Sequence, residues 1–162
     1  MRRLFVSALA ICALAQPAWA GFGATATMPV GASVFTRGYT GGTPTFDYRN
    51  AKLLVQLPLL DLIGSLADDA DGTELGMTAS FMARTSEISK ATEGVLMPGL
   101  GFHQGATGTD ITLHTRIGAE VKDKGTGLGV YVVPRLGMVL PKAGDSALSV
   151  GGAVEISAWF AP

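Results

Sequence analysis

The sequence predicts an all-β protein, an antiparallel up-and-down β-barrel of eight strands with one short amphipathic helix. Three observations lead to this prediction. Most of the chain alternates apolar and polar residues with a period of two, which places the two kinds on opposite faces of a strand. The alternating segments run to about 12–15 residues, against about 5–6 for strands of soluble sheets. The polar face is rich in glycine, and the chain holds 22 glycines, about twice the usual share.

Residues 1–20 have the three parts of a secretory signal peptide in order. Arg2 and Arg3 form the positive start, residues 4–14 form the apolar region, and Ala18-Trp19-Ala20 supplies the cleavage site. We therefore expect export, with residues 21–162 forming one β-barrel domain. The mature chain then has no cysteine and no disulfide.

The alternation predicts seven strands in order. It is clearest over 110–123, where Ile111 and Leu113 share one parity and Arg116 and Glu120 the other. Glycine-containing turns are expected at 123–127 and 141–145. The strands are expected at about 23–37, 46–57, 73–86, 94–105, 110–123, 127–140 and 147–160.

The apolar period changes at 58–68, where we expect the helix. Pro58 suits the first helical position, and Asp68 to Gly72 would end the helix. The alternative is that the preceding strand continues to Leu62. The apolar residues at helical spacing are Leu59, Leu60, Leu62, Ile63 and Leu66.

The polar parity carries scattered single charges, which suits the crowded interior of a narrow barrel with mutually paired ions. Aromatic residues near strand ends are typical of the girdles that mark bilayer interfaces. The candidate lumen network is Glu74, Arg84, His114, Arg116, Glu120, Arg135 and Glu155. The candidate interface aromatics are Tyr39, Phe46, Tyr48, Trp159 and Phe160.

Signal peptide, alternating strands, short turns and an aromatic-ended last strand together resemble the small bacterial outer-membrane β-barrel proteins. The resemblance covers residues 21–162 and is one of pattern. It implies a transmembrane barrel in a Gram-negative outer membrane, with the lipid bilayer and the barrel assembly machinery as partners. Members usually end in an aromatic, whereas here Ala161 and Pro162 follow Phe160. Such barrels have even strand numbers, so an eighth strand is expected, with 58–68 as one place for it.

Composition and motifs argue against other classes of function. Charged residues make up 15% of the chain and the net charge is −1, which excludes a typical nucleic-acid-binding protein. His103 and His114 lack metal-ligand spacing, and no Gly-x-Ser-x-Gly motif occurs. We therefore expect no enzymatic activity, no cofactor and no metal.

The expected function is a structural or interaction role, or that of a narrow channel, with loops near 38–46, 87–93 and 124–126 as contact sites. One alternative is a soluble periplasmic or secreted lipocalin-like barrel that binds a small apolar ligand. That alternative would bury Leu113, Val130 and Val132 and leave Arg116 in water; a lipid-embedded barrel requires the reverse. Another alternative is an adhesin or assembly subunit with an exposed edge strand.

Overall fold

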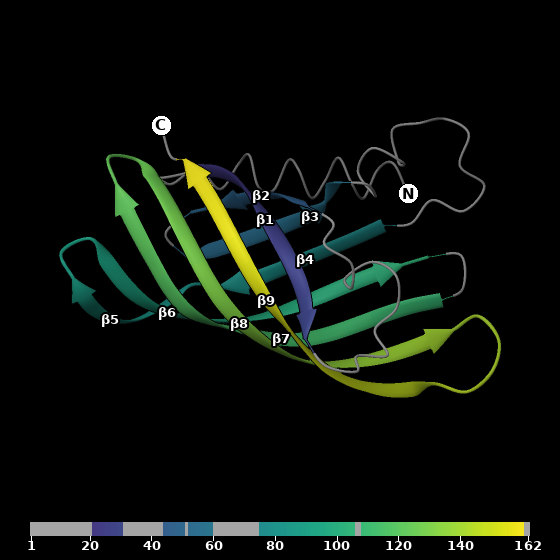
Figure 1. Ribbon diagram of the computed structural model, residues 1–162. Coiled ribbons are helices and arrows are strands. Elements are labelled where there is room, and N and C mark those ends of the chain that lie inside the picture. The colour runs from purple at the N-terminus through teal and green to yellow at the C-terminus, as the bar shows by residue number, and fades with distance from the viewer. Residues whose placement is uncertain (1–20, 31–43, 51, 60–74, 106–107, 161–162) are drawn as a thin grey trace.

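The computed structural model describes residues 21–30, 44–50, 52–59, 75–105 and 108–160, and these form nine strands of one antiparallel sheet (Figure 1). Within these ranges, no helix has the length and apolar character to cross a membrane. The strands are β1 (Gly21–Val30), β2 (Thr45–Arg49), β3 (Leu53–Pro58), β4 (Leu75–Phe81), β5 (Ala83–Ser89), β6 (Thr92–Gln104), β7 (Gly108–Asp123), β8 (Thr126–Pro141) and β9 (Ala147–Phe160).

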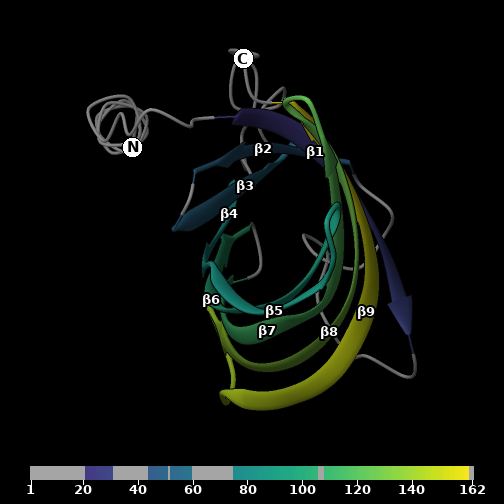
Figure 2. The same cartoon turned by 90° about the vertical axis from the view of Figure 1, so that its left-hand side faces the viewer.

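The sheet closes into a barrel with eight strand positions. Strands β4 and β5 share one position, because both pair with the same neighbour, β6, over different halves of it. Strand β4 also pairs with β3, and β1 pairs with β9, so the ring is complete. The strands curve round a common interior (Figure 2). The predicted all-β, antiparallel, up-and-down barrel of eight strands is therefore confirmed.

The eighth strand lies within 46–57, which the sequence predicted as a single strand. This segment is a hairpin of β2 and β3. The side-chain oxygen of Asn50 accepts hydrogen bonds from the backbone N–H groups of Lys52 (2.8 Å) and Leu53 (2.9 Å). An asparagine that bonds to backbone two and three residues ahead makes a turn without glycine or proline. This hairpin therefore supplies the eighth strand position.

The predicted short helix is not supported. Pro58, the expected first helical residue, is instead the last residue of β3, and it is paired with Thr45. All the elements formed by the described residues are strands. Leu59 has helical backbone at the edge of the described residues, and residues 60–68, the rest of the predicted helix, lie outside them.

The two ends of the barrel differ in their connections. One end holds Gly21, Phe160 and three tight hairpin turns, after Arg49, after Ser89 and after Asp123. The last of these has positive φ at Lys124 (41°) and Gly125 (87°), the two-residue turn typical of twisted hairpins. The opposite end carries the connections 31–44, 59–74, 105–107 and 142–146. We call the first the terminal end.

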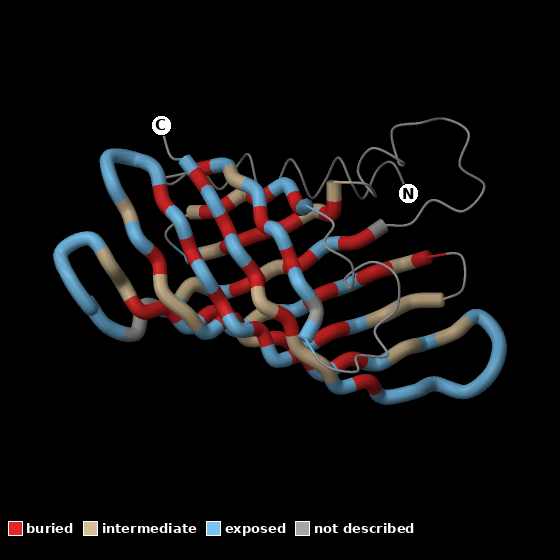
Figure 3. The backbone as a smooth tube through the Cα atoms, viewed as in Figure 1, coloured by how far each residue is buried: buried red, intermediate tan, exposed pale blue. Residues whose placement is uncertain are grey.

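The strand alternation is turned inside out relative to a water-soluble sheet. Along β7, β8 and β9 buried and exposed residues alternate (Figure 3). The polar parity is the buried one: Arg116 and Glu120 are 1% and 0% exposed. The apolar parity faces outward, with Leu113 56% and Val132 60% exposed. The interior is therefore polar and the outer surface apolar.

Glycines on the inner face make room for the side chains or the backbone of the neighbouring strand. Gly127 is paired with Trp159, and a Cβ at Gly127 would overlap the indole ring. Gly118 is paired with Tyr131, and a Cβ there would collide with the backbone carbonyl of Val130. These contacts give a physical reason for glycine inside long strands, where it is otherwise unfavourable.

Replacing Gly118 by alanine should destabilise the barrel by about 1–3 kcal/mol, because the backbone of β8 has to shift to admit the extra methyl group. Gly152→Ala is the matched control, since its Cβ would find only the Val133 carbonyl oxygen, at 3.7 Å. Urea unfolding in detergent micelles measures both free energies. Equal losses in the two variants would contradict the close packing at Gly118.

Candidate functional site: the charged interior

Glu155 holds two arginines in the middle of the barrel interior. The Nε of Arg116 donates to its Oε2, and the Nη2 of Arg135 donates to its Oε1, both at 2.6 Å. The three residues come from β7, β8 and β9, and none is more than 7% exposed. Ion pairs this short and this buried need partners on every remaining polar atom, because the charges have lost their water.

Arg116 extends this network across the interior. Its guanidinium donates to the hydroxyl of Ser80 on β4 and to the side-chain carbonyl of Gln56 on β3. Its Nη1 also lies 2.7 Å from the Nε2 of His114, which in turn lies 2.9 Å from the Ser80 hydroxyl. An imidazole nitrogen that accepts from a guanidinium carries no proton itself. Arg116 thus connects β7 to three other strands.

Asp47 is a second buried carboxylate, satisfied by neutral groups. The hydroxyls of Thr25 and Thr45 donate to its two oxygens at 2.5 Å each. The Gln56 amide donates at 3.3 Å and the Ser157 hydroxyl at 3.5 Å. Sequence reasoning did not select Asp47, although residues 45–49 alternate polar and aromatic residues and so indicate its inward parity.

A third network surrounds Glu120 near the terminal end. Arg49 donates from Nη2 to both of its oxygens at 2.9 Å, and the Tyr131 hydroxyl donates at 2.9 Å. The ammonium of Lys122 lies 3.4 Å from Glu120 and 2.9 Å from Glu93, linking the network to the rim. Arg49, like Asp47, was missed by sequence reasoning on the same alternating segment.

Trp159 belongs to this interior network and not to a bilayer interface as the sequence predicted. It is 7% exposed, and the Arg49 guanidinium carbon lies 3.7 Å from its ring centroid, a cation–π contact. Its parity on β9 is that of Glu155 and Ser157, which point inward. The position of Trp159 at a strand end suggested an interface aromatic, whereas its parity along β9 indicates the inward orientation that the structure shows.

The other predicted interface aromatics that the structure describes face outward. Phe46 and Phe160 are 38% and 58% exposed. The ring of Phe22 lies 5.7 Å from that of Phe46 and 5.9 Å from that of Tyr48, which forms an aromatic patch at the terminal end. Tyr39 lies outside the described residues.

Of the predicted lumen residues, the structure brings Arg116, Arg135, Glu155 and His114 together around one network and places Glu120 in another. Glu74 lies outside the described residues, and the side chain of Arg84, on β5, is not described either. The Glu155 network thus joins predicted residues from β7, β8 and β9, and the Glu120 network joins a predicted residue to Arg49.

An apolar cluster fills interior space beside these ion networks. Tyr131 belongs to the cluster through its ring and to the Glu120 network through its hydroxyl. Met97 on β6 is 0% exposed and paired in register with Arg116. The members are Leu54, Val95, Met97, Tyr131, Val133 and Ala153, with Met82 packed against them. Side chains, polar and apolar, thus occupy the described interior.

The described interior does not gather a metal-binding set. Among the described residues, no group of three or more histidine, cysteine, aspartate or glutamate side chains could hold an ion. Near the opposite end, the Nδ1 of His103 lies 3.9 Å from a carboxylate oxygen of Asp110, as a pair on adjacent strands. The interior carboxylates bind arginine, lysine and hydroxyl groups of the chain itself.

Comparison with known proteins adds one structural likeness. No protein-family model matches the sequence, and no curated protein matches it significantly. A crystal structure of Neisserial surface protein A matches with a TM-score of 0.40 at 13% sequence identity, over 88% of this chain and 95% of that one. The function proposed below rests on the geometry of this chain alone.

Removing Glu155 should destabilise the barrel strongly, because Arg116 and Arg135 would remain buried without their shared counterion. We expect Glu155→Leu to lower the free energy of unfolding by about 3–5 kcal/mol. Glu87→Leu, at an exposed position on β5, is the control and should have little effect. Urea titration in micelles measures both.

A triple variant that replaces Glu155 by leucine and both arginines by methionine should recover much of this loss, since no uncompensated charge is left inside. A triple variant no more stable than Glu155→Leu would show that the loss came from packing and not from the unpaired arginines.

Proposed function

We propose that this chain is a small outer-membrane β-barrel with a closed interior and a structural or interaction role, without catalytic activity. The observation that carries this proposal is the reversal of its two faces. Ion pairs and hydroxyls fill the inside, whereas large apolar side chains cover the outside. In an outer-membrane barrel the apolar face meets lipid, and lumen-facing and lipid-facing residues alternate along every strand.

The apolar outer face differs from the surface of a water-soluble protein. Soluble monomers rarely expose contiguous apolar patches of more than a few hundred Å². Here exposed large apolar side chains occur on every long strand, among them Leu100 on β6, Ile117 on β7, Val130 on β8 and Ile156 on β9. The soluble lipocalin-like alternative needs Leu113, Val130 and Val132 inside, and they are 55–60% exposed.

The arrangement of connections supports an orientation in the membrane. Outer-membrane barrels have short periplasmic turns and longer extracellular loops. The terminal end, with its tight turns, then faces the periplasm. We expect the signal peptide to direct export to the periplasm, and the barrel assembly machinery to insert the chain from there. Of the expected contact loops, 87–93 and 124–126 lie at this end, and 87–93 is mostly strand. Contacts with external partners would involve the connections at the opposite end of the barrel, of which 31–44 and 59–74 are the longest.

The filled interior supports a closed barrel and not a diffusion pore. Eight strands leave an interior just wide enough for side chains to fill. Arg116 reaches from β7 to Gln56 on β3, and Met97, Val133 and Leu54 add an apolar layer beside it. Polar solutes would have to break buried ion pairs to pass.

The barrel should therefore not conduct ions. In planar lipid bilayers we expect no channel steps from the purified protein, and none either after Val133→Ala, which leaves the Arg116 bridge in place. A defined unitary conductance from the wild-type protein, abolished on boiling, would support the narrow-channel reading of the fold instead.

Membrane fractionation tests the location. We expect the protein in the outer-membrane fraction, with a faster-migrating band in unboiled than in boiled gel samples, as closed detergent-stable barrels give. Val132→Arg places a charge on the outer face in the middle of β8 and should cost about 2–4 kcal/mol of stability in lipid.

Leu148→Arg is the matched control, on the same face at the end of β9 and 76% exposed. It should cost only about 0–1 kcal/mol, because charges near the interface remain hydrated. A soluble periplasmic protein with no gel shift, or equal tolerance of the two arginines in lipid, would overturn the proposal.

A further inference from the structure

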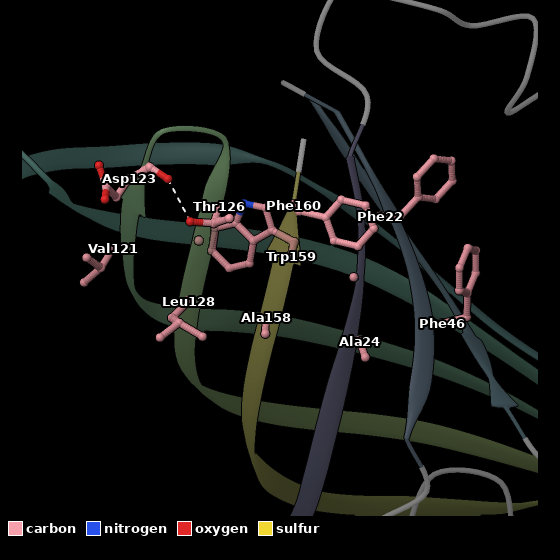
Figure 4. Close-up of a pocket in the computed structure, with 12 residues that line it drawn as sticks. Phe22, Ala24, Phe46, Val121, Asp123, Thr126, Leu128, Ala158, Trp159 and Phe160 are labelled. Carbon is pink, nitrogen blue, oxygen red and sulfur yellow. Dashed lines mark hydrogen bonds between the residues drawn. The ribbon is translucent and has the colours of Figure 1, made fainter. Parts of the chain in front are cut away.

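A groove on the outer surface interrupts the apolar band where the first and last strands meet. It lies at the terminal end, over the pairing of Phe22 on β1 with Phe160 on β9 (Figure 4). Its volume is about 690 Å³, within the range of about 300–1,000 Å³ that small-molecule sites show. Small residues make it possible: Ala24 and Ala158 are paired neighbours, with Gly23 and Gly127 beside them.

The lining of the groove selects a hydrocarbon ligand. Its sides are the apolar side chains of Phe22, Phe46, Val121, Leu128 and Phe160. Its polar side chains are Asp123 and Thr126, both at the β7–β8 turn, and the Thr126 hydroxyl already donates to the Asp123 carbonyl at 2.8 Å. The body of the groove offers no hydrogen-bonding side chain to a polar ligand, so burial of CH₂ groups is the interaction available.

The polar lip gives the ligand a direction. Lys124, exposed at the tip of the same turn, carries a positive charge next to Asp123. A zwitterionic phospholipid has the matching layout, because its acyl chain is apolar and its headgroup carries one charge of each sign, as Asp123 and Lys124 do at the turn. A lipid of the leaflet at the terminal end would enter with its chain between Phe22 and Phe160 and its headgroup beside the turn.

We propose that this groove holds one acyl chain of a phospholipid from the leaflet at the terminal end, retained in preference to the lipids around the rest of the barrel. The proposal rests on the proposed function, since a groove that opens on the apolar outer face meets hydrocarbon only in a bilayer. The groove is continuous with that lipid-facing band, and this continuity, with the charged lip, favours a lipid over a protein partner.

A tryptophan in place of Phe22 reports on the site, because Phe22 lines the groove and its side chain is 40% exposed on the outer face. The chain has two tryptophans, Trp19 and Trp159. A Phe22→Trp, Trp19→Phe variant is the parent protein for this experiment, and Trp159, buried inside, gives its unquenched baseline. It is reconstituted into phosphatidylcholine vesicles that contain a small fraction of phosphatidylcholine brominated along its acyl chain. Bromine quenches indole fluorescence on contact. We expect quenching that saturates at a brominated fraction well below that needed for the bulk bilayer.

Filling the groove should abolish the saturable quenching. Ala158→Phe and Ala24→Phe each place a ring where the chain would lie, and both positions face outward, so neither crowds the interior. Ala119→Phe is the matched control, an outward alanine on β7 outside the groove, and should quench like the parent. Quenching that follows the bulk fraction in the parent, or that survives in both filled variants, would overturn the proposal.

Native mass spectrometry from mild detergent identifies the occupant. We expect one retained phospholipid per barrel in the parent and in Ala119→Phe, and loss of that lipid in both filled variants. A dimer that Ala158→Phe dissociates would instead show a second copy of the chain in the groove. Failure of the chain to enter vesicles as a heat-modifiable barrel would overturn the proposed function, an outcome separate from normal insertion without saturable quenching.

Discussion

The buried guanidinium of Arg116 is the group on which the interior of this barrel depends. Removing such a charge from water costs several kcal/mol unless its donors find good acceptors. Here Glu155, Ser80, Gln56 and His114 supply them, from four strands spread round the ring. The position of each of these side chains is set by the register of its strand. The hydrogen-bond network of Arg116 can therefore form only when these strands are paired in the observed register.

The two faces of the sheet obey different rules. On the outer face, exposed apolar side chains of several shapes occur, among them Leu, Ile, Val, Met and Phe. Inside, volume and hydrogen bonding are both fixed. Gly127 is small because Trp159 is large, and Tyr131 lies where its hydroxyl reaches Glu120. Specificity of the fold thus resides in the inner face.

The sequence was sufficient to predict the barrel and its inner parity, because a closed sheet keeps a strict period of two over strands as long as β7, β8 and β9. It was not sufficient for β2 and β3, since Asn50 turns the chain through its own side chain, with no glycine or proline to mark the hairpin. Parity would have placed Asp47, Arg49 and Trp159 correctly, but the general rule for terminal aromatics misplaced Trp159. The partners of Arg116 depend on which strands face each other across the ring, which periodicity does not encode.

Closure of the ring by β1 and β9 has a consequence for the order of assembly. Phe22 pairs with Phe160, so the seam joins the two ends of the strand series and forms only after every strand has been synthesised. Arg116 donates to Gln56, 60 residues away in sequence, across the interior. Contacts of such long sequence separation form slowly, because the entropy of loop closure is lost before they contribute. The seam is therefore expected to be among the last pairings to form, and ring closure completes the barrel as one cooperative unit.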